Sequence, residues 1–210
     1  GELERVGYNR FISCERHDCC TEGGLLVYTL PVGMTQTNCY VVGCSKTREV
    51  AIIDPGDDAD RVLALVDEHA LTVRYVLNTH CHFDHMGANA EVVAATGALL
   101  ALHPAETPLL RARGAAHLFG LSGNDSPLPD LLLDDGDELI VGSLQFRVLL
   151  TPGHSPGGVA FYLAEQEVVF VGDVLFAGGV GRTDLPGGDW DTLEASIRDV
   201  LFQLPDETVV

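Results

Sequence analysis

Short apolar runs separated by turn residues dominate the first part of the chain. Runs rich in Val, Ile, Leu and Tyr occupy residues 25–32, 39–42 and 49–54, and glycines or a Pro-Gly pair interrupt them. Apolar runs of about four to eight residues bounded by turn residues are typical of strands. The pattern therefore predicts a meander of three strands.

Apolar residues at helical spacing follow this meander. Val62, Leu63, Leu65 and Val66 predict a helix over residues 59–69. The same reasoning predicts further helices at 88–96, 104–113 and 189–204. Strands are expected between and after them, at 73–77, 98–102, 138–141, 144–150, 159–163, 167–171 and 207–210. Residues 114–129 are rich in Gly, Ser, Asn, Asp and Pro and are expected to form a loop.

Strands precede helices in each half of the chain, and no internal repeat or linker is visible. This order is typical of helices packed over the faces of a sheet. We therefore expect one α/β domain over residues 25–210, preceded by a polar N-terminal arm over residues 1–24.

Composition and charge narrow the class of protein. Apolar residues make up 46% of the chain, which excludes a wholly disordered chain. The 31 acidic and 12 basic residues give a net charge of −19, which argues against binding of nucleic acids or anionic membranes. No apolar run approaches the roughly 20 residues that span a bilayer, and the first dozen residues resemble no signal peptide. We expect a cytoplasmic protein.

The chain holds six cysteines, too few for a disulfide scaffold. Free thiols in a reducing compartment are the expectation without an export signal. Cys14, Cys19 and Cys20, with His17, could bind a metal ion, because thiolates and imidazole suit zinc. Their spacing matches no standard zinc module, so surface or packing thiols are favoured.

Four side chains able to bind a metal ion follow the expected strand 73–77. The segment Thr79-His80-Cys81-His82-Phe83-Asp84-His85 places His80, His82 and Asp84 on one side if it is extended, and His85 joins them only through a turn. Histidines and acids also occur in ordinary polar loops. The full string directly after an apolar strand, where α/β sheets present their sites, favours a metal site.

Two further strand ends present a histidine and a carboxylate. Strand 144–150 runs into Thr151-Pro152-Gly153-His154, and strand 167–171 runs into Gly172-Asp173. Taken singly, His154 is explained as a turn residue and Asp173 as a cap. Three strand ends that deliver histidine and aspartate in this order favour one shared site.

In this order the motifs T-H-x-H-x-D-H, T-P-G-H-S-P-G and V-G-D resemble those of the metallo-β-lactamase superfamily of hydrolases. The resemblance covers residues 25–210 and implies a four-layer αββα sandwich, the metallo-β-lactamase fold, with a metal site at one edge. The segment 179–189, G-V-G-R-T-D-L-P-G-G-D, is more specific. It is similar to the single-domain form of the hydroxyacylglutathione hydrolase (glyoxalase II) branch.

By motif position the resemblance implies six metal ligands: His80, His82 and His154 for a first ion, Asp84 and His85 for a second, and Asp173 as a bridge. It implies two divalent ions, zinc foremost, with iron or manganese as alternatives. The implied activity is hydrolysis of a small-molecule thioester of the S-acylglutathione type by a metal-bound hydroxide, which Asp84 orients. A thiolate leaving group, with a thiol pKa of about 8.5, needs no dedicated general acid.

Two residues near these motifs have two interpretations each. Cys81 could be a nucleophile or sulfur ligand, but alternation turns it away from His80 and His82, which favours a small buried apolar residue. Arg182 either binds an anionic group of the substrate or pairs with Asp184 to set its loop. With Lys46 the only lysine, Arg182 is the candidate substrate contact.

The chain departs from the family pattern at its end. In the family a P-G-H segment after the last long helix completes the second metal site, whereas this sequence ends at Val210. The sequence is thus expected to be a truncated piece, or a domain with an incomplete second site. These residues also do not include the helical glutathione-binding domain of longer glyoxalase II enzymes, so we expect the single-domain form.

Two other functions stay open. A persulfide dioxygenase, with one iron on two histidines and an aspartate, shares T-H-C-H and G-R-T-D, although Leu185-Pro186-Gly187-Gly188 favours the hydrolases. A non-catalytic binding module with an incomplete metal site is the other, and the full set of six side chains argues against it. A true β-lactamase is disfavoured because no export signal is visible.

Overall fold

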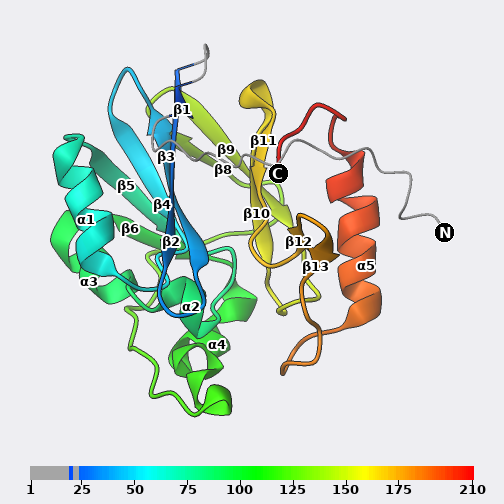
Figure 1. Cartoon of the computed structure of the whole chain (residues 1–210). Coiled ribbons are helices and arrows are strands. Elements are labelled where there is room, and N and C mark those ends of the chain that lie inside the picture. Colours follow the sequence, from blue (N-terminus) through cyan, green and yellow to red (C-terminus); the bar gives the residue numbers. More distant parts are fainter. Residues whose placement is uncertain (1–18, 21–23) are drawn as a thin grey trace.

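Two β-sheets pack face to face, and helices cover both outer faces (Figure 1). The computed structural model describes residues 19–20 and 24–210. Helices α1 (Ala59–Glu68) and α3 (Asn89–Thr96) lie outside the first sheet, and α5 (Trp190–Asp199) lies outside the second (Figure 1). The expected α/β architecture, a four-layer αββα sandwich, is confirmed.

The first sheet has seven strands in chain order. Strands β1 to β4 are antiparallel neighbours, and β4 to β7 are parallel ones. The strands are β1 (Cys19–Cys20), β2 (Leu25–Val32), β3 (Thr37–Cys44), β4 (Glu49–Ile53), β5 (Thr72–Leu77), β6 (Leu99–Leu102) and β7 (Leu131–Leu132). Because parallel strands end at the same edge, the residues after β4, β5 and β6 are brought together there.

The second sheet has four antiparallel strands in the order β11-β10-β9-β8. They are β8 (Glu138–Val141), β9 (Leu144–Leu150), β10 (Val159–Leu163) and β11 (Val168–Phe170). A short hairpin of β12 (Leu175–Phe176) and β13 (Gly179–Val180) follows. Together with β9 and β11, this hairpin brings the second half of the chain to the same edge of the sandwich (Figure 1).

The core explains why the strands are continuous apolar runs. Ile53 of β4 and Phe161 of β10 lie between the two sheets, whereas the adjacent Ile52 faces the helices and the adjacent Ala160 faces α5. Successive side chains in a strand point to opposite faces, and here both faces are covered. Each strand therefore contributes to two apolar layers at once.

Single-turn elements are where the structure differs from the pattern-based expectations. The expected helix 104–113 is divided into η2 (Pro104–Glu106) and α4 (Thr107–Arg111), and the expected helix 189–204 ends early, with η5 (Leu201–Gln203) after it. The expected loop 114–129 begins in η3 (Arg113–Phe119), a 3₁₀ segment that is kinked at Gly114 and Ala115. Two further short elements, α2 (Phe83–Met86) and η4 (Ala164–Gln166), were not expected.

The prediction of a strand at residues 207–210 is wrong. Only one bridge forms, between Val209 and Val168 of β11, through hydrogen bonds from Val169 N to Val209 O and from Val209 N to Glu167 O. Of the expected N-terminal arm, residues 1–24, the structure describes only Cys19, Cys20 and Gly24. Cys14 and His17 of the possible metal-binding cluster therefore lie outside the described residues. Within the described part of the chain, none of the helices is long and apolar enough to cross a membrane.

Candidate metal centre

The segments that follow five strands meet at one edge of the sandwich. Asp54 follows β4, residues 79–85 follow β5, Glu106 follows β6, His154 follows β9 and Asp173 follows β11. The first three segments belong to parallel neighbours, and the last two belong to the facing sheet. The edge therefore collects polar side chains from both halves of the chain.

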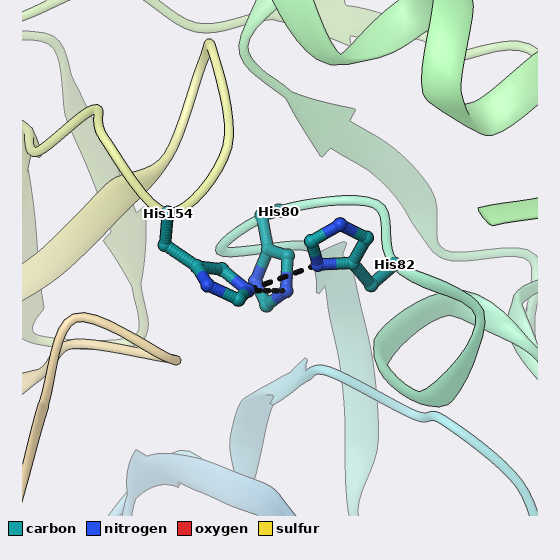
Figure 2. Close-up of side chains that lie close together, drawn as sticks. All are labelled: His80, His82 and His154. Carbon is teal, nitrogen blue, oxygen red and sulfur yellow. Dashed lines mark hydrogen bonds between the residues drawn. The ribbon is translucent and has the colours of Figure 1, made fainter. Parts of the chain in front are cut away.

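Three histidines form the buried centre of this edge. His154 Nε2 lies 2.9 Å from His82 Nδ1 and 3.2 Å from His80 Nε2 (Figure 2). All three side chains are buried, and their ring planes are nearly perpendicular to one another. The rings thus point their nitrogen atoms at a common space instead of stacking.

The opposite nitrogens of these rings reveal which ones carry a proton. His154 Nδ1 lies 2.8 Å from the carbonyl oxygen of Arg182, which only accepts, so Nδ1 is the donor. The Thr79 hydroxyl donates to Asp54 at 2.6 Å and therefore accepts from His80 Nδ1 at 3.1 Å. His80 Nε2 and His154 Nε2 then each carry a lone pair and no proton. The two atoms lie 3.2 Å apart but cannot form a hydrogen bond, because neither is a donor. Such a pair fits a cation between them.

A second group of side chains adjoins the first. His85 Nε2 lies 3.2 Å from Asp173 Oδ1 and 3.9 Å from Asp84 Oδ2, and the other Asp173 oxygen lies 3.6 Å from His154 Nε2. His85 Nε2 is buried without a hydrogen bond of acceptable geometry. Asp84 accepts a hydrogen bond from Thr37 at 2.9 Å. The structure therefore brings all six residues expected from the motifs together, with Asp173 between the two groups.

The turn that His85 requires is provided by α2. His82 has an extended backbone with φ −66° and ψ 153°, and the helix begins at the next residue, Phe83. After the change from extended to helical backbone, His85 reaches Asp173 and Asp84 reaches Thr37, while His80 and His82 stay in the preceding segment. This explains how four ligand-type side chains in six residues reach two adjacent groups.

Asp54 is a site residue that the sequence reasoning missed. Its carboxylate is buried and accepts from Thr79 N at 2.7 Å, from Thr79 Oγ1 at 2.6 Å and from His85 Nδ1 at 3.0 Å. Asp54, His80 and His85 also lie close enough to form a potential ligand group. Both oxygens of the Asp54 carboxylate already accept hydrogen bonds from these donors. We therefore interpret Asp54 as a residue that orients the histidines and not as a metal ligand. Its position directly after an apolar strand was the available signal.

Burial and charge set the protonation of the histidines. Burial, reinforced by the neighbouring imidazoles, lowers the pKa of His80 well below its usual value and that of His82 to about 4. Burial also acts to lower the pKa of His85, but the carboxylates of Asp54 and Asp173 outweigh it and raise that pKa well above its usual value. Burial raises the pKa of Asp173, but His85 outweighs it, so the net shift is downward. His80 and His82 are therefore neutral at neutral pH, as metal ligands must be.

Cys81 packs among the apolar side chains between the first sheet and its helices. It is fully buried, and burial raises the pKa of its thiol well above the usual value. A thiol that stays protonated is a poor nucleophile and a poor ligand. The interpretation of Cys81 as a small buried residue is confirmed.

Arg182 lies at the rim of the site. Its Nε and Nη2 donate to the two carboxylate oxygens of Asp184 at 2.7 and 2.8 Å, and its guanidinium lies 5.9 Å from the centre of the Phe119 ring. Phe119 in turn contacts Phe83, the neighbour of His82. The pairing with Asp184 satisfies the loop-setting interpretation, and the substrate contact stays a prediction.

A cavity of about 620 Å³ opens beside the second group. Asp84, His85 and Asp173 line one side of it, and Tyr40 and Phe170 line the apolar part. Val210 also lies on its wall. The carboxylates of Asp84 and Asp173 therefore face open space, whereas His85 is buried like the three histidines of the first group.

Residues 32–210 match the model of the metallo-beta-lactamase superfamily, and the chain belongs to that superfamily of metallo-hydrolases. It is 39% identical over 184 residues to a probable metallo-hydrolase, YqgX, of Bacillus subtilis, covering 86% of each chain. It is 37% identical over 184 residues to the hydroxyacylglutathione hydrolase GloC of Haemophilus influenzae, again covering 86% of each.

Solved structures agree with this family. BLEG-1, a B3 metallo-beta-lactamase, superposes with a TM-score of 0.81 at 38% identity, and TTHA1623 in a di-iron-bound form with 0.77 at 43% identity; each match covers 85% of this chain and 87% of the other. ETHE1 from Myxococcus xanthus superposes with a TM-score of 0.72 at 33% identity, covering 87% of this chain and 72% of that one. The names of BLEG-1 and GloC state different activities, so membership of the superfamily does not by itself define the substrate.

Proposed function

We propose that this protein is a metal-dependent thioesterase that hydrolyses S-acylglutathione-type substrates. The observation that carries the proposal is the approach of His80 Nε2 and His154 Nε2 to 3.2 Å beside the His85–Asp173 pair. The similarity to GloC, whose name states hydroxyacylglutathione hydrolysis, supports the choice of substrate.

The residues present fit two divalent metal ions. His80, His82 and His154 would hold the first, Asp84 and His85 the second, and Asp173 both. Imidazole and carboxylate donors suit zinc foremost and also iron or manganese, and the di-iron form of TTHA1623 supports iron as an alternative. When bound, ions of this kind would lower the pKa of a coordinated water towards about 7 and would polarise a substrate carbonyl.

The protein's own side chains have three tasks in this proposal. Asp84, whose side chain is 20% exposed and anchored by Thr37, orients the attacking water by accepting its hydrogen bond. The buried histidines exclude bulk water from one side of the centre. The leaving thiolate departs without protonation, because the pKa of a thiol is about 8.5. We assign no covalent protein nucleophile, since the Cys81 thiol is buried in the core.

Arg182 is the proposed substrate contact. Asp184 engages Nε and Nη2, which leaves Nη1 for an anionic group of the substrate. Substitution of Arg182 by Ala is expected to raise KM about fivefold with kcat within about twofold, since the contact would bind the ground state and the transition state equally and is weakened by solvent. Steady-state kinetics on an S-acylglutathione check this, with the exposed Arg198→Ala as the control. An unchanged KM would assign Arg182 to its loop alone.

The test of the function compares reactions on one metal-loaded preparation. We expect thiol release from an S-acylglutathione, slower hydrolysis of the matching oxygen ester, and about two metal ions per chain. Absence of thiol release with two ions bound would contradict the proposal.

The similarity to ETHE1, taken with the shared T-H-C-H and G-R-T-D motifs, favours persulfide dioxygenase as the second candidate. One bound iron with oxygen uptake on glutathione persulfide would support it. No bound metal would favour the non-catalytic module. The cytoplasmic location stays a prediction, consistent with the free, buried thiols of Cys39, Cys44 and Cys81.

A further inference from the structure

Glu106 is a fully buried carboxylate that joins the two histidine-bearing segments. Oε2 accepts from the backbone N–H of Cys81 at 2.8 Å, and Oε1 accepts from the backbone N–H of Gly157 at 2.7 Å. Cys81 lies between His80 and His82, and Gly157 lies three residues after His154. One side chain therefore contacts the backbone between His80 and His82 and the backbone of the segment that carries His154.

Glu106 reaches this place through a single turn after β6. His103 caps the turn by accepting from Ala105 N at 3.2 Å, and Pro104 occupies its first position. The turn packs so tightly on the second segment that a Cβ at Gly157 would lie 2.6 Å from His103 Nδ1 and 3.0 Å from the Ala105 Cβ. The contact between the turn and Gly157 is therefore close and has little room to shift.

A carboxylate is the side chain that this position requires. Both partners are N–H donors, and an ionised carboxylate accepts at both oxygens, whereas a glutamine presents one acceptor and one donor. Within the described residues Glu106 has no ion pair with a cationic side chain. Burial of a charge is costly unless hydrogen bonds compensate it, and these two charge-assisted bonds are the compensation present here.

The two segments come from different sheets, so their relative position needs a link. A backbone bond from Val159 N to Thr79 O provides one link just before His80, and Glu106 provides another just after it. The His80 and His154 rings cannot link the segments to each other without a cation, because their facing Nε2 atoms both carry lone pairs. His82 Nδ1, 2.9 Å from His154 Nε2, is the one ring nitrogen of the three that can donate across the segments.

We propose that Glu106 is a positioning residue that fixes the His80–His82 segment against the His154 segment, so that the three ring nitrogens converge before a metal ion binds. The inference rests on the proposed metal site and is independent of the substrate. It concerns the first group of ligands, since Glu106 contacts the segments that carry His80, His82 and His154.

The experiment compares Glu106→Gln, Glu106→Asp and the control Asp130→Asn, which alters another carboxylate bond to a backbone N–H, that of Leu100 at 2.9 Å. Zinc affinity is measured by chelator competition and the ligand geometry by the absorption spectrum of the cobalt-loaded protein. For Glu106→Gln we expect affinity for the first ion about 10- to 100-fold weaker, as for other partners that orient metal ligands, with an altered cobalt spectrum. Glu106→Asp is expected to lose less zinc affinity than Glu106→Gln, and Asp130→Asn is expected to keep the wild-type affinity.

Amide hydrogen exchange of the metal-free protein provides a readout that does not depend on metal or activity. In Glu106→Gln, exchange at Cys81 or Gly157 is expected to be faster than in wild type, with the core strands unchanged. Zinc affinity within twofold of wild type, an unchanged cobalt spectrum and unchanged exchange would overturn the inference. Loss of affinity in Glu106→Gln with a wild type that binds zinc but releases no thiol would support the inference and contradict the proposed thioesterase.

Discussion

At the scale of single residues, the Asp54 carboxylate orders both groups of histidines. It accepts from His85 Nδ1 directly and fixes His80 through the Thr79 hydroxyl. Its backbone has φ 51°, a left-handed conformation that is uncommon outside glycine and that turns the chain at the end of β4. One buried acid thereby selects the protonated nitrogen on a histidine of each group.

Substitution of Asp54 by Asn is expected to weaken zinc binding at both groups by about 10- to 100-fold. The amide nitrogen would face the Thr79 hydroxyl and His85 Nδ1, both of which are donors to the wild-type carboxylate. Zinc competition with a chelator measures the effect, and the exposed Asp57→Asn is the control. Equal affinity in the two variants would remove Asp54 from this role.

Proton competition is expected to differ between the two groups. Because the pKa values of His80 and His82 are lowered, the affinity for the first ion is expected to change little between pH 7.5 and pH 6 on their account. The pKa of His85 is raised, so the second ion must displace its proton, and affinity falls about tenfold for each pH unit lowered below that pKa. Calorimetric titration in buffers of different ionisation enthalpy counts the released protons. A second-ion affinity that is constant over this range would contradict the assignment of His85.

At the scale of elements, short turns carry the site while long strands provide the frame. The apolar runs predict the strands because burial on both faces leaves a strong signal. Elements such as η2 and η3 are too short or too irregular to show a helical spacing of apolar residues in the sequence. The position of Glu106 at the site was therefore not predicted. Asp54 was missed because one acid before a Pro-Gly pair looks like an ordinary turn residue.

The packing of η3 on α2 depends on Gly114. A Cβ there would lie 2.2 Å from the Phe83 backbone nitrogen and 2.7 Å from the His82 carbonyl carbon, and its φ is +64°. Gly114→Ala is therefore expected to displace the start of α2, lowering both stability and zinc affinity. Gly120→Ala is the matched control, because its φ is +73° but no atom lies within 4 Å of its Cβ.

Chemical unfolding and zinc competition measure the two variants. Gly120→Ala is expected to lose about 1–2 kcal/mol, the cost of a left-handed backbone with a Cβ, and to keep its zinc affinity. Gly114→Ala is expected to lose more stability and to bind zinc more weakly. Equal losses in the two variants would show that the contact with α2 has no consequence for the site.

At the scale of the whole molecule, two sheets from the two halves of the chain meet and place their ligand-bearing ends at one edge (Figure 1). The histidine string predicted one half of the site, and His154 and Asp173 predicted the other, because each follows an apolar strand. Sequence alone could not give the distances or the proton positions. Those depend on contacts between residues far apart in the chain, such as His82 with His154.

The net charge of −19 has little bearing on this site. Most of the 31 acids are outside it, and two of the proposed ligands, Asp84 and Asp173, are acidic. Two divalent ions would add four positive charges and leave −15, so the surface stays strongly acidic. An anionic substrate would then depend on the ions and on Arg182.

The most direct test of the central claim is the metal content of purified Asp173→Ala. Asp173 lies between the two groups, with one oxygen 3.2 Å from His85 Nε2 and the other 3.6 Å from His154 Nε2. We predict about two metal ions per chain in wild type and in the exposed control Glu165→Ala, and one or none in Asp173→Ala, with thioester turnover lost in parallel. Two retained ions and near-normal turnover in Asp173→Ala would contradict the two-metal centre.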